Sequence, residues 1–214
     1  LNTRQKFMCV SRPRRFGKTM AADMLAVYYA RGEDSAELFE SLKISKAESY
    51  EKHRNQYDVI KVNMQEFLSM THSMDEMLVM LQKYLIFDLM DHFETVRFRD
   101  EHNLIQVMKD IYSKTNHSFI ILIDEWDCLF REYKQDKEAQ KEYLDFLRAW
   151  LKDKDYVALA YMTGILPIKK YGSHSALNMF TEYSMTDPGD LAEYFGFTEK
   201  EVFALCEKYD MSFE

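Results

Sequence analysis

The residues of this chain best suited to chemistry are Gly17, Lys18 and Thr19, which follow an apolar run at residues 7–10 and open a helical pattern. Backbone N–H groups in the first turn of a helix, together with the helix dipole, favour bound anions. Gly17 lets the backbone approach a ligand, Lys18 is expected to reach the β- and γ-phosphates of a nucleotide, and the Thr19 hydroxyl is expected to hold a magnesium ion. The layout therefore predicts a phosphate-binding loop.

The loop departs from the common pattern G-x-x-x-x-G-K-[ST], because Arg12 occupies the first glycine position. Arginine adopts a left-handed backbone less readily than glycine, so the start of the loop is expected to differ from the usual one. A basic turn before a surface helix is the alternative interpretation of this segment taken alone. The predicted nucleotide-binding residues are Arg12, Pro13, Arg14, Arg15, Phe16, Gly17, Lys18, Thr19 and Met20.

Two carboxylates follow the apolar run Phe-Ile-Ile-Leu-Ile at residues 119–123. Such a run predicts a strand buried on both faces, as in parallel sheets covered by helices, whose ligands bind at the carboxyl ends of the strands. Asp124 is expected to hold magnesium, directly or through water, and Glu125 to orient or deprotonate the water that attacks the γ-phosphate. An acidic turn in solvent is the alternative for this segment alone, but both motifs in one chain favour nucleotide binding.

Thr163 directly follows the predicted strand at residues 157–162 and is the candidate sensor of the γ-phosphate. Ordinary turn chemistry at a strand end is the equal alternative. Trp126, beside the acids, could stack on a base or pack under the sheet, and packing is favoured.

Several basic residues lie close to the predicted site in sequence. Arg14 and Arg15 could stabilise transition-state charge or pair with a carboxylate such as Asp127. Lys169 and Lys170 could reach a phosphate, but a solvated charge pair is favoured.

Composition restricts the remaining classes of protein. The 214 residues are enough for one α/β domain with a small appendage, and the net charge of −8 argues against coating nucleic acid by bulk electrostatics, although a local basic patch stays open. Cys9, Cys128 and Cys206 have no metal-site spacing and fit a reducing compartment. No stretch is apolar enough to cross a bilayer and no signal peptide is visible, so a cytoplasmic protein is expected.

Strand and helix patterns alternate along the chain, which predicts an α/β fold: a P-loop NTPase with a parallel sheet and helices on both faces. Strands are expected at residues 7–11, 58–64, 119–123, 157–162 and 182–185, and the main helices at 18–29, 72–93, 100–114, 138–152, 188–195 and 199–209. In the first helix Met20, Met24, Leu25 and Val27 are expected to form the apolar face. The predicted division is a P-loop ATPase core at residues 1–187 and a small helical extension at 188–214.

Five segments together resemble the predicted AAA-ATPase-like family of bacteria: residues 11–19, 37–42, 121–125, 163–165 and 194–201. The Arg-Pro-Arg-Arg-Phe-Gly-Lys loop is specific to that family, so the resemblance makes Arg12 a family trait. It implies a P-loop ATPase fold with an additional catalytic glutamate, and Lys18, Thr19, Asp124 and Glu125 in the roles given above. The usual Asp-Glu-Tyr-Asp reads Asp-Glu-Trp-Asp here, which leaves the acids in place.

Members of that family often carry a C-terminal nuclease-like domain of the PD-(D/E)XK type. This chain stops near the place where that part would begin, and it contains no such motif.

The function expected from the sequence is Mg²⁺-dependent ATP binding and hydrolysis, with turnover coupled to a conformational change. Lys18, Glu125 and Thr163 are the predicted catalytic residues, and Thr19 and Asp124 the predicted metal ligands. The alternative is a slow-turnover, nucleotide-dependent interaction switch in a defence or mobile-element setting; a small-molecule kinase is a weaker third interpretation. ATP and Mg²⁺ are the expected ligands, and a second copy or another protein is the expected partner. A role for nucleic acid stays open, and no membrane is expected.

Overall fold

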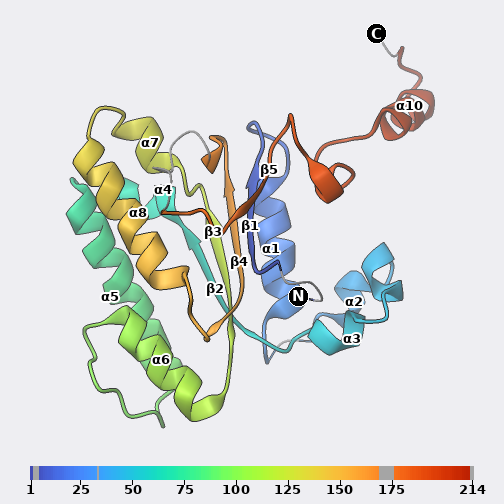
Figure 1. Cartoon of the computed structure of the whole chain (residues 1–214). Coiled ribbons are helices and arrows are strands. Elements are labelled where there is room, and N and C mark those ends of the chain that lie inside the picture. Colours follow the sequence, from blue (N-terminus) through green and yellow to red (C-terminus); the bar gives the residue numbers. More distant parts are fainter. Residues whose placement is uncertain (2–4, 33, 169–175, 213–214) are drawn as a thin grey trace.

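The computed structural model describes residues 1, 5–32, 34–168 and 176–212. Within these residues, five parallel strands form one sheet in the order β2-β3-β4-β1-β5 (Figure 1). The strands are β1 (Phe7–Ser11), β2 (Asp58–Asn63), β3 (Phe119–Asp124), β4 (Val157–Gly164) and β5 (Thr181–Tyr183). Because every pair is parallel, the carboxyl ends of β1, β3 and β4 meet at one edge of the sheet, with β4 between the other two.

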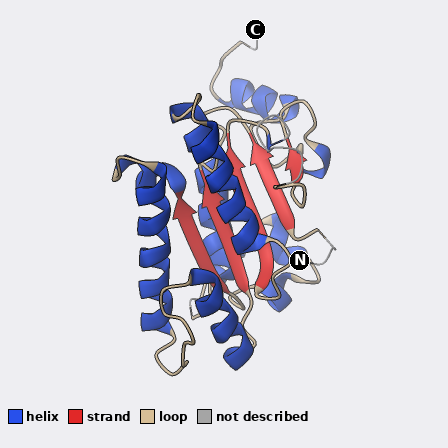
Figure 2. Cartoon of the chain, turned by 60° about the vertical axis from the view of Figure 1, so that its left-hand side comes forward, coloured by secondary structure: helices blue, strands red, loops and turns tan. Residues whose placement is uncertain are grey.

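Helices cover both faces of this sheet (Figures 1 and 2). The long helices are α1 (Lys18–Tyr29), α5 (Met74–His92), α6 (Leu104–Thr115) and α8 (Lys137–Leu151). Side chains of β3 alternate between two buried clusters: Ile121 packs with residues of α5, α6 and α8, whereas Ile120 and Leu122 pack with Ala22 of α1. The fully buried apolar run at residues 119–123 is thus explained by its central place between two helical layers.

The shorter elements connect these layers. They are α2 (Ala36–Phe39), the 3₁₀ helix η1 (Lys43–Lys46), α3 (Tyr50–His53), α4 (Met64–Ser69), α7 (Cys128–Glu132), the 3₁₀ helix η2 (Gly189–Leu191) and α10 (Glu199–Lys208). No described helix combines the length and the apolar character that crossing a membrane requires.

The expected apolar face of α1 is wrong. Met20, Met24 and Val27 are exposed and Leu25 is only partly buried, whereas Ala22 is almost completely buried against the sheet. The small Ala22 side chain lets the helix lie close to β3, and Leu25, Ala26 and Tyr29 pack beside it on the inward face.

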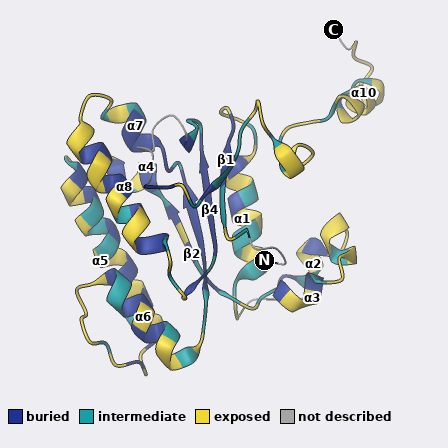
Figure 3. Cartoon of the chain, viewed as in Figure 1, coloured by how far each residue is buried: buried dark blue, intermediate teal, exposed yellow. Residues whose placement is uncertain are grey.

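The predicted helix at residues 188–195 is also wrong, since only the short turn η2 forms there. Gly189 has a φ of +47°, which interrupts regular helical backbone close to its start. The final helix, α10, does form, with Thr198 and Glu201 in a reciprocal capping box. No residue of α10 is buried (Figure 3).

Candidate nucleotide-binding site

The loop between β1 and α1 has the backbone geometry of an anion-binding turn. Arg15 and Gly17 have positive φ values of 68° and 73°, and Gly17 is the residue from which α1 starts. No side chain caps the first turn of α1. The N–H groups of that turn therefore have no side-chain acceptor, which is the arrangement that suits a bound phosphate.

Three predicted site residues meet at the carboxylate of Asp124, at the end of β3. The Thr19 hydroxyl donates a hydrogen bond to Oδ2 at 2.6 Å, and the Thr163 hydroxyl donates one to Oδ1. The backbone N–H of Glu125 also donates to Oδ1, at 3.0 Å. Asp124 is 1% exposed, and its carboxylate is held by partners from α1, from β4 and from the residue that follows β3.

Lys18 lies over the loop that it follows. Its ammonium nitrogen donates to the carbonyl oxygen of Pro13 at 2.9 Å, and the side chain is buried. Burial lowers the pKa of Lys18, while the nearby carboxylates of Glu125, Asp124 and Asp127 act in the opposite direction. The ammonium group and the acids predicted from distant parts of the sequence therefore share one electrostatic environment.

Arg12 joins the loop to the sheet and to the C-terminal segment. Its guanidinium donates to the carbonyl oxygens of Tyr183, at 2.6 Å, and Ser11, at 3.1 Å, and lies 5.5 Å from the ring centre of Phe195. Its backbone N–H donates to Gly164 at 3.1 Å. Both the N–H and the guanidinium of this residue thus have protein partners, which gives the departure from glycine a structural reason.

The other predicted loop residues face outward. Pro13, Arg14, Arg15 and Met20 are exposed, and Phe16 is partly buried. Lys169 and Lys170 lie outside the described residues.

Asp127 pairs with a different arginine from those considered in the sequence. Its fully buried carboxylate accepts hydrogen bonds from the backbone N–H groups of Ile165, at 3.1 Å, and Leu166, at 2.8 Å. Arg131, on α7, approaches the same oxygen with Nε at 3.6 Å. These contacts hold residues 165 and 166, which follow β4, against the turn that follows β3.

Gly164, at the end of β4, lies directly against Trp126 and Asp127, in the turn that follows β3. A Cβ atom at this position would lie 2.7 Å from Asp127 Oδ1 and 2.7 Å from Nε1 of Trp126. The approach therefore needs a residue without a side chain. Trp126 is fully buried in the core, so packing, and not base stacking, is the role that the structure gives it.

Glu125 follows Asp124 with a φ of 53°, a left-handed conformation that is uncommon for a residue with a side chain. Its carboxylate forms an ion pair with Nη2 of Arg131. Sequence reasoning missed Arg131 because α7 has only five residues, too few to show a helical period.

The donor set suits a hard divalent cation such as magnesium. The groups that meet are the oxygen atoms of Thr19 and Asp124, which are hard ligands of the type that Mg²⁺ prefers. Within the described residues, no group of three His, Cys, Asp or Glu side chains could hold a metal ion. A magnesium ion here would complete its shell with phosphate oxygens and water, as it usually does.

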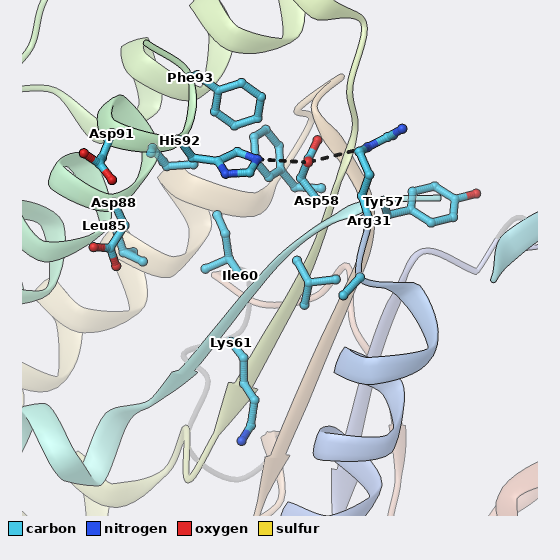
Figure 4. A pocket seen from close by; sticks show the side chains of 14 residues that line it. Arg31, Tyr57, Asp58, Ile60, Lys61, Leu85, Asp88, Asp91, His92 and Phe93 are labelled. Atoms are coloured by element: carbon cyan, nitrogen blue, oxygen red, sulfur yellow. Dashed lines mark ion pairs between the residues drawn. The ribbon is translucent and has the colours of Figure 1, made fainter. Parts of the chain in front are cut away.

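A separate cavity of about 490 Å³ lies at the opposite, amino-terminal end of β2 (Figure 4). It surrounds Asp58, which is 9% exposed and is approached by Nε of Arg31 at 3.6 Å and by Nε2 of His92 at 4.0 Å. Nδ1 of His117 lies 3.0 Å from the other carboxylate oxygen. Because Asp58 is the first residue of its strand and the loop lies at the strands' carboxyl ends, this cavity is not part of the candidate site.

Fold and site together define a P-loop NTPase-like α/β domain: a parallel sheet covered by helices, with the loop after β1 brought against an acid at the end of β3. The chain belongs to the AAA-ATPase-like family, described as predicted AAA-ATPase, whose family model matches residues 1–173. No curated protein matches the chain, and no solved structure matches it. The resemblance expected from the loop and the acids is thereby confirmed at the level of family and fold.

Proposed function

We propose that this protein binds ATP with Mg²⁺ and hydrolyses it. Lys18 would contact the β- and γ-phosphates, and Thr19 and Asp124 would hold the ion, which supplies charge stabilisation to the phosphates when bound. Glu125 would orient or deprotonate the attacking water, and Thr163 would sense the γ-phosphate through Asp124. The exposed backbone of the loop from Pro13 to Met20 would surround the phosphates.

The observation that supports this proposal best is the contact between Thr19 and Asp124, whose side-chain oxygens are 2.6 Å apart. The two residues are 105 positions apart in the sequence, and the strands that lead to them, β1 and β3, are not neighbours in the sheet because β4 lies between them. An isolated basic turn and an isolated acidic turn, the alternatives for each segment alone, would not require a direct hydrogen bond between these two side chains. A shared phosphate and metal site gives a reason for it.

The test is phosphate release and nucleotide affinity for the wild type, Lys18→Ala and Glu125→Gln. Lys18→Ala should lose most affinity for ATP in calorimetry, because a charge that contacts phosphate is removed. Glu125→Gln should keep ATP binding but lower phosphate release by about 100-fold or more, the usual effect of removing a general base. Release should need Mg²⁺ and stop with EDTA.

Matched controls are Lys83→Ala and Glu132→Gln, which make the same changes at exposed positions outside the site. Both should behave as the wild type. Unchanged ATP affinity in folded Lys18→Ala would refute the role of Lys18.

The second candidate is a nucleotide-dependent interaction switch with slow turnover, and the ion pair between Glu125 and Arg131 favours it, because the pair directs Oε2 of Glu125 toward α7. Equal and near-zero phosphate release from wild type and Glu125→Gln, with ATP still bound, would support the switch. In either case we propose that the nucleotide state changes the protein's conformation or its contacts with a second copy or another protein.

A further inference from the structure

Arg131 is the one cation in the described part of the chain that forms an ion pair with the predicted catalytic glutamate. Its Nη2 contacts Glu125 Oε2, and its Nε is 3.6 Å from Asp127 Oδ2. The side chains of Arg131 and Glu125 are only 18% and 23% exposed. The pair is therefore shielded from solvent, where ion pairs are weakened least by salt.

This pairing has a chemical consequence for Glu125. A general base must place a free carboxylate lone pair on the water whose proton it takes. In the structure, Oε2 accepts a hydrogen bond from the guanidinium of Arg131, and this contact directs the carboxylate toward α7. Glu125 is thus held toward α7 in a state that does not favour activation of water.

Arg131 has two other acceptors nearby that could replace Glu125. Its Nη2 lies 3.4 Å from Oε1 of Gln65, on α4, which packs against α7. Asp127, on its other side, is anchored by the backbone of residues 165 and 166 and stays in place. Release of Glu125 would therefore leave the guanidinium with two acceptors, so two arrangements of the same side chains are available.

We propose that Arg131 is a positioning residue that holds Glu125 out of the reaction in the nucleotide-free protein, and that hydrolysis requires Glu125 to leave this ion pair. The inference rests on the proposed ATPase function and names the regulation of that site. Its partners in the second state are Gln65 and Asp127.

The decisive variant is Arg131→Gln, which removes the charge but keeps a side chain of similar length. Its kcat for ATP should rise about tenfold, equivalent to about 1.4 kcal/mol in the barrier. The dissociation constant for ATP should not change, because Lys18 and Thr19 are untouched. Arg131→Lys keeps the charge and should return kcat toward the wild-type value.

A second variant leaves Arg131 in place. Gln65→Glu offers the guanidinium a competing carboxylate and should also raise kcat. The increase in both variants should vanish in a Glu125→Gln background, because it acts through that carboxylate. Arg54→Gln is the matched control: Arg54 is also 18% exposed and pairs with two carboxylates, Asp34 and Glu51, in a region away from the site.

The outcomes separate this inference from the function on which it rests. A wild type that hydrolyses ATP through Glu125, with kcat unchanged or lower in both Arg131→Gln and Gln65→Glu, would overturn the role of Arg131 alone. Phosphate release absent from the wild type and from both variants, with ATP bound, would overturn the ATPase proposal. A rise that survives in the Glu125→Gln background would also contradict the ion-pair mechanism.

Discussion

Removing the carboxylate of Asp127 tests whether this side chain holds the loop after β4 against the turn that follows β3. Asp127 is fully buried and accepts two backbone hydrogen bonds, from Ile165 and Leu166. A hydrogen bond to a charged group contributes about 1.5–3 kcal/mol, so two contribute about 3–6 kcal/mol. Removing one partner of a buried ion pair costs about 3–5 kcal/mol, and here Arg131 keeps its other carboxylate, Glu125, so the loss comes mainly from the two backbone N–H groups. We therefore expect Asp127→Ala to lower the free energy of unfolding by about 3–5 kcal/mol.

Asp127→Asn should cost less, about 1–2 kcal/mol, because the amide oxygen can still accept both bonds but without the charge. Urea unfolding followed by tryptophan fluorescence is a suitable assay, since both tryptophans, Trp126 and Trp150, are fully buried. Asp145→Ala, at an exposed position of α8, is the control and should change stability by less than about 0.5 kcal/mol. A loss below about 1 kcal/mol in Asp127→Ala would refute the reasoning.

Two further expectations concern thiol reactivity and acid stability. Burial raises the pKa of Cys128 to about 12 and also raises the pKa of Cys9. Native protein at pH 8 should therefore be alkylated only at the partly exposed Cys206, which mass spectrometry can check. Fast labelling of either buried thiol would contradict their burial. Burial acts to raise the pKa of Asp110, but hydrogen bonds from Arg99 and Gln106 outweigh it and hold the pKa below its ordinary value. A lowered carboxyl pKa adds stability above the unfolded-state value that is lost as the pH falls through the folded-state value, so Asp110→Asn should be less stable at neutral pH and lose less stability below about pH 4. Identical acid unfolding curves for variant and wild type would show that Asp110 makes no such contribution.

The strands and long helices could be predicted because their signals are local. The apolar run at residues 119–123 and the loop from Gly17 to Thr19 identify β3 and the start of α1 without knowledge of the rest of the chain. The inward face of α1 could not be predicted in this way. Which side packs on a sheet depends on how closely the two backbones approach, and here the small Ala22 is almost completely buried against the sheet.

The meeting of the loop with Asp124 follows from the parallel sheet, in which carboxyl ends share an edge. The partners that tune the site do not follow from sequence pattern. Arg131 lies on a five-residue helix, and its pairing with Glu125 depends on how the chain turns after β3. Arg12 predicts an unusual start of the loop, but its contacts to Tyr183 and Phe195 come from a segment about 170 to 180 positions later.

Arg12 also couples the position of the loop after β1 to that of the C-terminal segment. A glycine at this position would have no side chain to make distant contacts, whereas the arginine side chain contacts the carbonyl oxygen of Tyr183 and the ring of Phe195. A shift of Arg12 would therefore change its contacts with Tyr183, at the end of β5, and with Phe195, on the way to α10. The residue that weakens the match to the general motif therefore also joins the loop after β1 to the segment that leads to α10.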